Sequence, residues 1–251
     1  MSQKARSNRK SHNNVFYIED EKIAKTSLTL KTFEPLTTNQ ALTFKGYQRQ
    51  KNLMLYGVAG TGKTFLAMYL ALNELLRTKS HYHKIVVVRS VVPSRDVGFL
   101  PGTVKQKAEV YELPYHDLCA ELFGRSDAHE ILVKKGILEH LTTSFIRGTT
   151  LNNSIIIVDE CQNMNDHELN TIATRPGDRS RLIFCGDIRQ NDLATSRDKS
   201  GLLEFMKIVR EMGSFEFVEF ELQDIVRSGF VKEYITKRTE LEDKGLIVPL
   251  K

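Results

Sequence analysis

Residues Asn52 to Ala71 read NLMLYGVAGTGKTFLAMYLA. The segment opens with a short apolar run that predicts a buried strand, and it closes with an apolar run long enough for a helix. Between these runs, Gly57 to Thr64 read GVAGTGKT, a full match to the GxxxxGKT pattern of a P-loop. A P-loop between a strand and a helix predicts a site for a nucleoside triphosphate.

The residue types of this turn suit a phosphate ligand. Glycines let the backbone curl so that successive N–H groups point at phosphate oxygens, and the following helix adds the positive end of its dipole. Lys63 would reach the β- and γ-phosphates, and Thr64 would place its hydroxyl on Mg²⁺. A Gly-rich turn that matches by chance is the alternative. The expected phosphate-binding residues are Gly57, Val58, Ala59, Gly60, Thr61, Gly62, Lys63 and Thr64.

Length and composition suit one α/β domain, since the chain has 251 residues, of which 41% are hydrophobic. No apolar run approaches the roughly 18–20 residues of a membrane span, and the N-terminus lacks the apolar core of a signal peptide. The cysteines Cys119, Cys161 and Cys185 show no CxxC spacing. They predict reduced thiols, and hence a cytoplasmic protein without a membrane partner.

The positive charge of the chain is concentrated at its start. The formal net charge is +5, and residues 1–14 contain Lys4, Arg6, Arg9 and Lys10 but no acid. We expect residues 1–18 to be a basic, disordered tail and residues 19–251 to form the folded domain. Such a tail suits non-specific contact with nucleic acid, or solubility alone.

Strand and helix patterns alternate along the rest of the chain. Besides the strand at 53–56, we expect strands at 85–88, 142–146, 155–158, 182–185 and 215–222. We expect helices after a cap at Thr37 or Thr38, at 104–112, 115–123, 128–135, 167–173 and 201–212, and from 229 onward. This alternation predicts an α/β fold with a mostly parallel sheet covered by helices on both faces.

Carboxylates stand where ligands of such sheets bind, at the carboxyl end of a strand. Asp159 follows the apolar strand 155–158, as in the Walker B pattern, and would hold Mg²⁺. Glu160, its neighbour, suits the role of general base that polarises the attacking water. The alternative is an acidic residue that merely caps the next helix or loop.

A third candidate segment, Cys185 to Gln190, follows the strand 182–185. If this strand lies between the P-loop strand and the strand before Asp159, Gln190 or Asp187 would face the γ-phosphate and the attacking water. A neutral amide there would report the presence of the phosphate to moving loops. Gly-Asp is also ordinary turn chemistry.

The three segments GVAGTGKT, IIIVDECQ and GDIRQ together resemble the first RecA-like domain of superfamily 1 helicases. The fuller match is to PhoH-like proteins, a family of ATPases inducible by phosphate starvation. The correspondence runs from about Gln40 to Val231 and includes GFLPG at 98–102 and DIVR at 224–227. The resemblance implies a P-loop NTPase with a single RecA-like core that binds and hydrolyses ATP with Mg²⁺.

Further site residues follow from the resemblance alone. Gln40 would read the adenine edge, the alternative being an exposed helix residue. Arg227 would be the arginine finger, with Arg175 as a second candidate. Because 24 residues follow Arg227 in this chain, the finger is expected to act in trans between subunits of a homo-oligomeric ring, expected to be a hexamer. The alternative is a surface Arg227 paired with Asp224 or Glu221.

Some positions depart from the family pattern. Cys161 stands where Ala is expected, Thr149 replaces an Arg, Ser228 replaces a His and Ala194 replaces a Pro. These changes leave the residues expected to hydrolyse ATP in place, and they make coupling to a substrate less secure.

Three functions compete at this point. The first is a ring-forming, helicase-like ATPase that acts on RNA or single-stranded DNA. The second is a regulatory switch that binds a protein partner according to its ATP or ADP state and turns over slowly. The third is a small-molecule kinase, which the lack of an Arg-dense lid disfavours.

Overall fold

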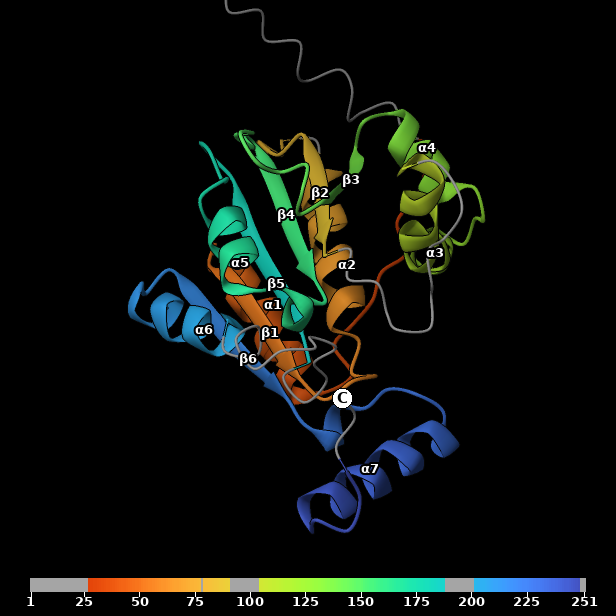
Figure 1. The fold of residues 1–251 in the computed structure, drawn as a ribbon. Helices are drawn as coiled ribbons and strands as arrows, with labels where there is room; N and C mark the ends of the chain where they lie inside the picture. The colour runs from red at the N-terminus through yellow and green to blue at the C-terminus, as the bar shows by residue number, and fades with distance from the viewer. Residues whose placement is uncertain (1–26, 78, 91–103, 188–200, 249–251) are drawn as a thin grey trace, which may run out of the picture.

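The computed structural model describes residues 27–77, 79–90, 104–187 and 201–248, with the backbone alone for 104–110 (Figure 1). The expected basic tail at 1–18 and the expected start of the domain at residue 19 lie outside the described residues, and so does Gln190.

The described strands form one parallel sheet, as expected. Its order is β3-β2-β4-β5-β1-β6. The strands are β1 (Asn52–Gly57), β2 (Lys84–Arg89), β3 (Leu138–Thr142), β4 (Ser154–Asp159), β5 (Arg181–Gly186) and β6 (Phe215–Phe220). The order places β5 between β1 and β4, which is the condition set above for Asp187 to reach the nucleotide site.

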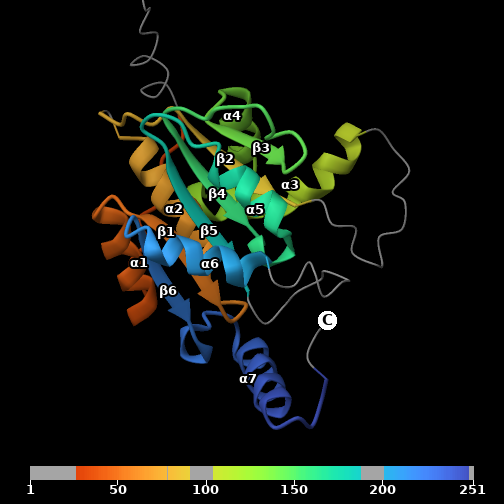
Figure 2. The same ribbon diagram turned by 60° about the vertical axis from the view of Figure 1, so that its left-hand side comes forward.

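Helices cover both faces of the sheet (Figures 1 and 2). They are α1 (Thr38–Gln48), α2 (Lys63–Leu75), α3 (Val104–Phe123), α4 (Ala128–Lys134), α5 (Asp166–Ala173), α6 (Gly201–Glu211) and α7 (Gly229–Asp243). The core forms two clusters, because successive strand residues point to opposite faces. One packs the strands against α1 to α4, and the other packs them against α5 and α6. The four central strands, β2, β4, β5 and β1, are therefore mainly apolar runs, as strands covered on both faces are.

Three predicted elements, one strand and two helices, were wrong. The strand expected at 142–146 ends at Thr142, and the next residues turn, with Phe145 N donating to Thr142 O. The actual strand, β3, lies at the edge of the described sheet. Among the described strands it pairs only with β2, so it tolerates Glu139 and His140 and gives no apolar run. The helices expected at 104–112 and 115–123 are one helix, α3, with Pro114 inside it and exposed to solvent.

The chain segments that follow the carboxyl ends of β1, β4, β5 and β6 line a cavity. A short 3-10 helix, η2 (Cys161–Asn163), follows β4, and another, η3 (Leu222–Asp224), follows β6 and leads to α7. Figure 2 shows α7 projecting beyond the carboxyl end of β6. Among the described residues, none of the helices has the length and apolar character needed to cross a membrane.

Candidate nucleotide site

A cavity of about 500 Å³ lies at the carboxyl ends of the central strands. The P-loop, Asp159 and Glu160 line it, and so does Asp187 after β5. Residues that lie up to 168 positions apart in the sequence, Ala59 and Arg227, thus meet in one place. The structure brings together the expected phosphate, Mg²⁺ and general-base residues.

One side of the P-loop faces the cavity, and the opposite side packs against the end of β6. At the β6 side, Val58 N donates to Phe220 O over 2.9 Å, and a Cβ at Gly57 would collide with the same carbonyl oxygen. Gly57 also has φ +117, which a side chain rarely permits. The cavity-lining residues of the loop are Ala59, Gly60, Gly62, Lys63 and Thr64, whereas Gly57, Val58 and Thr61 are absent from its lining.

Lys63 begins α2 and lies buried beneath the loop. Its Nζ donates to Gly57 O over 3.0 Å and to Val58 O over 2.7 Å. Burial lowers the pKa of Lys63, while the negative charge of Asp187 opposes that shift. Two carbonyl contacts therefore hold the ammonium at the floor of the cavity, and its third N–H, 3.4 Å from Thr61 Oγ1, can be shared with a phosphate oxygen.

Asp159 is held by hydroxyl groups at both of its oxygens. Thr64 Oγ1 donates to Asp159 Oδ1 over 2.7 Å, and Tyr115 Oη donates to Asp159 Oδ2 over 2.7 Å. A hydroxyl and a carboxylate oxygen side by side are the hard oxygen ligands that Mg²⁺ prefers, so the donor set fits that ion. Burial, and then the Asp159 charge, raises the pKa of Tyr115 well above its usual value.

Sequence reasoning missed Tyr115. The residue lies 44 positions before Asp159, on α3, where an aromatic residue at helical spacing indicates only a core position. Tyr115 is almost fully buried and packs in the core cluster as well. Only the fold shows that its hydroxyl reaches the Walker B carboxylate.

Glu160 follows directly after β4 in a left-handed backbone conformation, with φ 51 and ψ 42. Such a conformation costs a side-chain-bearing residue on the order of 1–3 kcal/mol and occurs most often at functional sites. Gln162 Nε2 donates to Glu160 Oε2 over 2.6 Å. Burial, and then the charge of Asp159, raises the pKa of Glu160. A raised pKa makes the carboxylate a stronger base toward water.

Gln162 joins the ends of two neighbouring strands. While its Nε2 donates to Glu160, its Oε1 accepts from Asp187 N over 3.0 Å. The sequence predicted an amide sensor at Gln190, which lies outside the described residues. Among the described residues, Gln162 is the amide that connects Glu160 to the end of β5. Gln162 belongs to the IIIVDECQ segment, but its position in that segment gave no indication of its role.

Gln40 contacts the P-loop from below. Thr37 caps α1 by accepting from Gln40 N over 3.3 Å, which confirms the cap. The Gln40 side chain is 4% exposed, so the alternative of an exposed helix residue is wrong. Its Nε2 donates to Thr61 O over 3.4 Å, and its Oε1 accepts from Leu36 N over 2.8 Å. Gln40 thus braces the P-loop, and its expected contact with adenine stays a prediction.

Arg227 lies at the mouth of the cavity of its own chain. The preceding residue, Val226, donates its N–H to Gly60 O over 3.2 Å, and a Cβ at Gly60 would lie 3.2 Å from Arg227 Cγ. Asp224, the suggested ion-pair partner, instead accepts from Asn39 Nδ2 over 2.7 Å. The expected role in trans stays a prediction, and in this structure Arg227 lines the cavity of its own chain.

Two more arginines occupy different places. Arg175, the second finger candidate, is absent from the cavity lining; it lines a small hollow with Arg147, His167 and Thr171, and its Nε donates to Thr171 O over 3.2 Å. Arg89, at the end of β2, does line the nucleotide cavity. Sequence reasoning did not single out Arg89, although a cation that ends an apolar strand was a usable signal.

Comparison with known proteins agrees with this geometry. A family model described as PhoH-like protein matches residues 32–238. The chain is 33% identical to the PhoH-like protein of Bacillus subtilis (strain 168) over 189 residues, which are 74% of this chain and 58% of that protein. It is 34% identical to the PhoH-like protein of Synechocystis sp. over 200 residues, with 79% and 60% covered.

The similarity extends to Protein PhoH of Escherichia coli (strain K12), with 31% identity over 186 residues that cover 73% of this chain and 52% of that protein. The chain thus spans between 52% and 60% of the length of these three relatives. The family match covers most of the chain and agrees with the motifs read from the sequence. The chain belongs to the PhoH-like protein family.

Proposed function

We propose that this chain is a Mg²⁺-dependent ATPase. The observation that carries the proposal is the convergence of Lys63, the Thr64–Asp159 pair and Glu160 on one cavity at the carboxyl ends of β1, β4 and β5. A P-loop alone suits many families. Glu160, a partly buried carboxylate of raised pKa beside the expected Mg²⁺ ligands, adds the group that activation of water requires.

The residues divide the reaction between them. The P-loop backbone and Lys63 bind the phosphates and neutralise charge on the transferred group. Thr64 Oγ1 and Asp159 Oδ1 would hold Mg²⁺, which supplies further neutralisation when bound. Glu160 orients a water molecule in line with the γ-phosphorus and accepts its proton as the oxygen attacks. Water adds to phosphorus, the bond to the leaving ADP oxygen breaks, and Gln162 keeps the Glu160 carboxylate in place.

Coupling to nucleic acid is the finer part of the proposal. We infer that the ATPase acts on RNA or single-stranded DNA as a ring, expected to be a hexamer, because its motifs are similar to those of superfamily 1 helicases. The alternative is an ATP/ADP switch for a protein partner. That alternative draws support from Gln162, whose amide links the expected general base, Glu160, to Asp187 at the end of β5.

The first test is steady-state ATP hydrolysis by the purified chain with Mg²⁺, with and without single-stranded RNA or DNA at fixed low salt. We expect hydrolysis that EDTA abolishes and that one of the two nucleic acids stimulates. A rate that ignores both nucleic acids would leave the ATPase and reject the coupling. No ATP-dependent phosphate release under any of these conditions would reject the ATPase itself.

Tyr115→Phe tests the hydroxyl that holds Asp159. The change removes the donor to Oδ2 and leaves the ring in the core. Loss of a hydrogen bond to a metal ligand typically costs about 10–100-fold in metal affinity or activity. We therefore expect the Mg²⁺ concentration for half-maximal hydrolysis to rise about 10-fold or more. Tyr111→Phe, one turn earlier on α3, is the matched control. An unchanged Mg²⁺ dependence in Tyr115→Phe would show that Asp159 needs no such support.

A further inference from the structure

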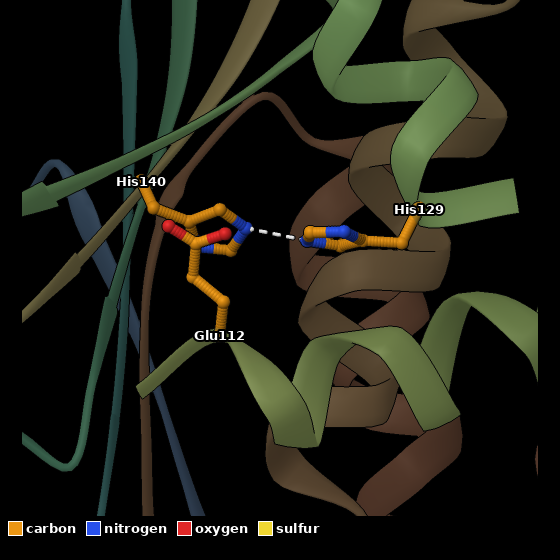
Figure 3. A group of neighbouring side chains, drawn as sticks. All are labelled: Glu112, His129 and His140. Atoms are coloured by element: carbon orange, nitrogen blue, oxygen red, sulfur yellow. Dashed lines mark hydrogen bonds between the residues drawn. The ribbon is translucent and has the colours of Figure 1, made fainter. Parts of the chain in front are cut away.

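We propose that Glu112, His129 and His140 form a binding site for a transition-metal ion of the Zn²⁺ type, separate from the nucleotide ligands. The three side chains come from α3, α4 and β3 and converge in the space between them (Figure 3). Two imidazoles and one carboxylate are a donor set that proteins use for zinc, and the fourth position is then filled by water.

The distances are close to those of a metal site. His129 Nε2 and His140 Nε2 are 2.9 Å apart, and the ligand atoms of the three residues all lie within 4.8 Å of one another. Donors around a tetrahedral zinc ion with bonds of about 2.0–2.1 Å lie about 3.3 Å apart. The imidazole pair therefore needs only a slight widening, and the carboxylate, on a flexible three-torsion side chain, closes the remaining gap.

The two histidines are shielded from solvent. His129 is 2% exposed, and His140 is partly buried. A neutral imidazole has one nitrogen lone pair, which is the group that binds a metal ion. His116 stacks on His129 with ring centroids 3.7 Å apart, which fixes the plane of that ring.

There is room for a fourth ligand. A small cavity of about 40 Å³ borders Glu112 and His140. That volume exceeds the roughly 10–15 Å³ that one water molecule requires. The donor set also separates this site from the Mg²⁺ site, because imidazole nitrogen suits Zn²⁺, whereas Thr64 and Asp159 offer only oxygen.

Metal binding at this site would affect the nucleotide site through α3. Tyr115 lies one turn after Glu112 on that helix, its ring centroid is 5.0 Å from that of His140, and its hydroxyl contacts Asp159. A metal that holds Glu112 against α4 and β3 would fix the turn of α3 that carries Tyr115. This consequence rests on the proposed function, whereas metal binding itself does not.

The test uses the full chain without a histidine tag, stripped with EDTA and dialysed. Zn²⁺ binding is measured by competition with a chromophoric chelator, and Co²⁺ is added as a spectroscopic probe. Excess Mg²⁺ and the absence of nucleotide keep the oxygen site from contributing. We expect one tight Zn²⁺ per chain, the intense visible bands of tetrahedral Co²⁺, and a rise in Tm on addition of Zn²⁺.

Three variants separate the site from other ligands. Glu112→Gln should weaken Zn²⁺ binding at least about 10-fold, and His140→Asn should remove the Co²⁺ bands, with circular dichroism confirming the fold. His167→Asn, an exposed histidine on α5, should change neither. The proposal is overturned if folded wild-type chain shows no tetrahedral Co²⁺ spectrum, or if His140→Asn binds as tightly as wild type. The contact would then be an Nε2–H···Nε2 hydrogen bond between neutral rings.

Discussion

Glu160→Gln is expected to lower kcat for ATP hydrolysis by about 10²–10⁴-fold while ATP still binds. The range is the usual contribution of a positioned general base. The amide keeps the size and shape of the carboxylate but cannot take the proton of the attacking water. Lys63, Thr64 and Asp159 are untouched, so the phosphates and Mg²⁺ keep their partners. Phosphate release measures turnover, and a fluorescent ATP analogue measures affinity.

Glu204→Gln is the matched control for this prediction. Glu204 is an exposed carboxylate on α6, so its change should leave both the turnover and the affinity for ATP unchanged. Turnover by Glu160→Gln within a few-fold of wild type would remove Glu160 from the role of base. The same variant separates the two proposed functions, because a protein partner that binds it undiminished with ATP would support the switch.

Arg227→Ala is expected to lower kcat by about 10³–10⁵-fold if its guanidinium acts as an arginine finger. The side chain lies at the cavity mouth beside Gly60, where a second cation would meet charge that develops on the transferred phosphoryl group. Affinity for ATP should change far less. Arg125→Ala, an exposed arginine between α3 and α4, provides the control. A rate within about 10-fold of wild type would rule out a finger at this position.

Mixing variants decides which subunit uses the finger. If Arg227 acts in trans within a ring, Lys63→Ala and Arg227→Ala chains assembled together should recover part of the activity, because some interfaces then combine an intact P-loop with an intact arginine. If Arg227 acts within its own chain, the mixture stays inactive. A mixture of Lys63→Ala with Glu160→Gln is the control, since both changes impair the same subunit's half of the site. Light scattering establishes whether the chains assemble at all.

The fold was largely predictable because its central strands are short, mainly apolar runs, which are easy to recognise in a sequence. The strands β2 and β4, buried on both faces, are runs of β-branched residues, and the P-loop marks the turn after β1. The edge strand β3 was misplaced for the opposite reason. With a single neighbour, it includes Glu139 and His140, and the apolar pattern that identifies buried strands is missing.

The site was predictable where the chemistry lies in the turns after strands. The P-loop pattern pointed to Lys63 and Thr64, and the carboxyl end of a parallel strand pointed to Asp159 and Glu160; the four residues line one cavity, and their roles stay predictions. Tyr115 could not be found in this way, since it reaches the site from a helix whose pattern indicates only packing. The prediction for Gln190 is untested. For Arg227, sequence spacing gave no information about the contact of its segment with Gly60.

The hydrogen bond between Val226 and Gly60 connects the P-loop directly to the segment that leads into α7. Gly60 O accepts from Val226 N, and Ile235 of α7 packs within reach of a Cβ at Gly60. If the proposed ATP changes the shape of the loop when it binds, this hydrogen bond passes the change to the segment that leads into α7. Phe230 and Tyr234 extend from that helix into solvent, 78% and 56% exposed. Under the proposed function, one hydrogen bond therefore connects the phosphate site to a helix that exposes apolar side chains.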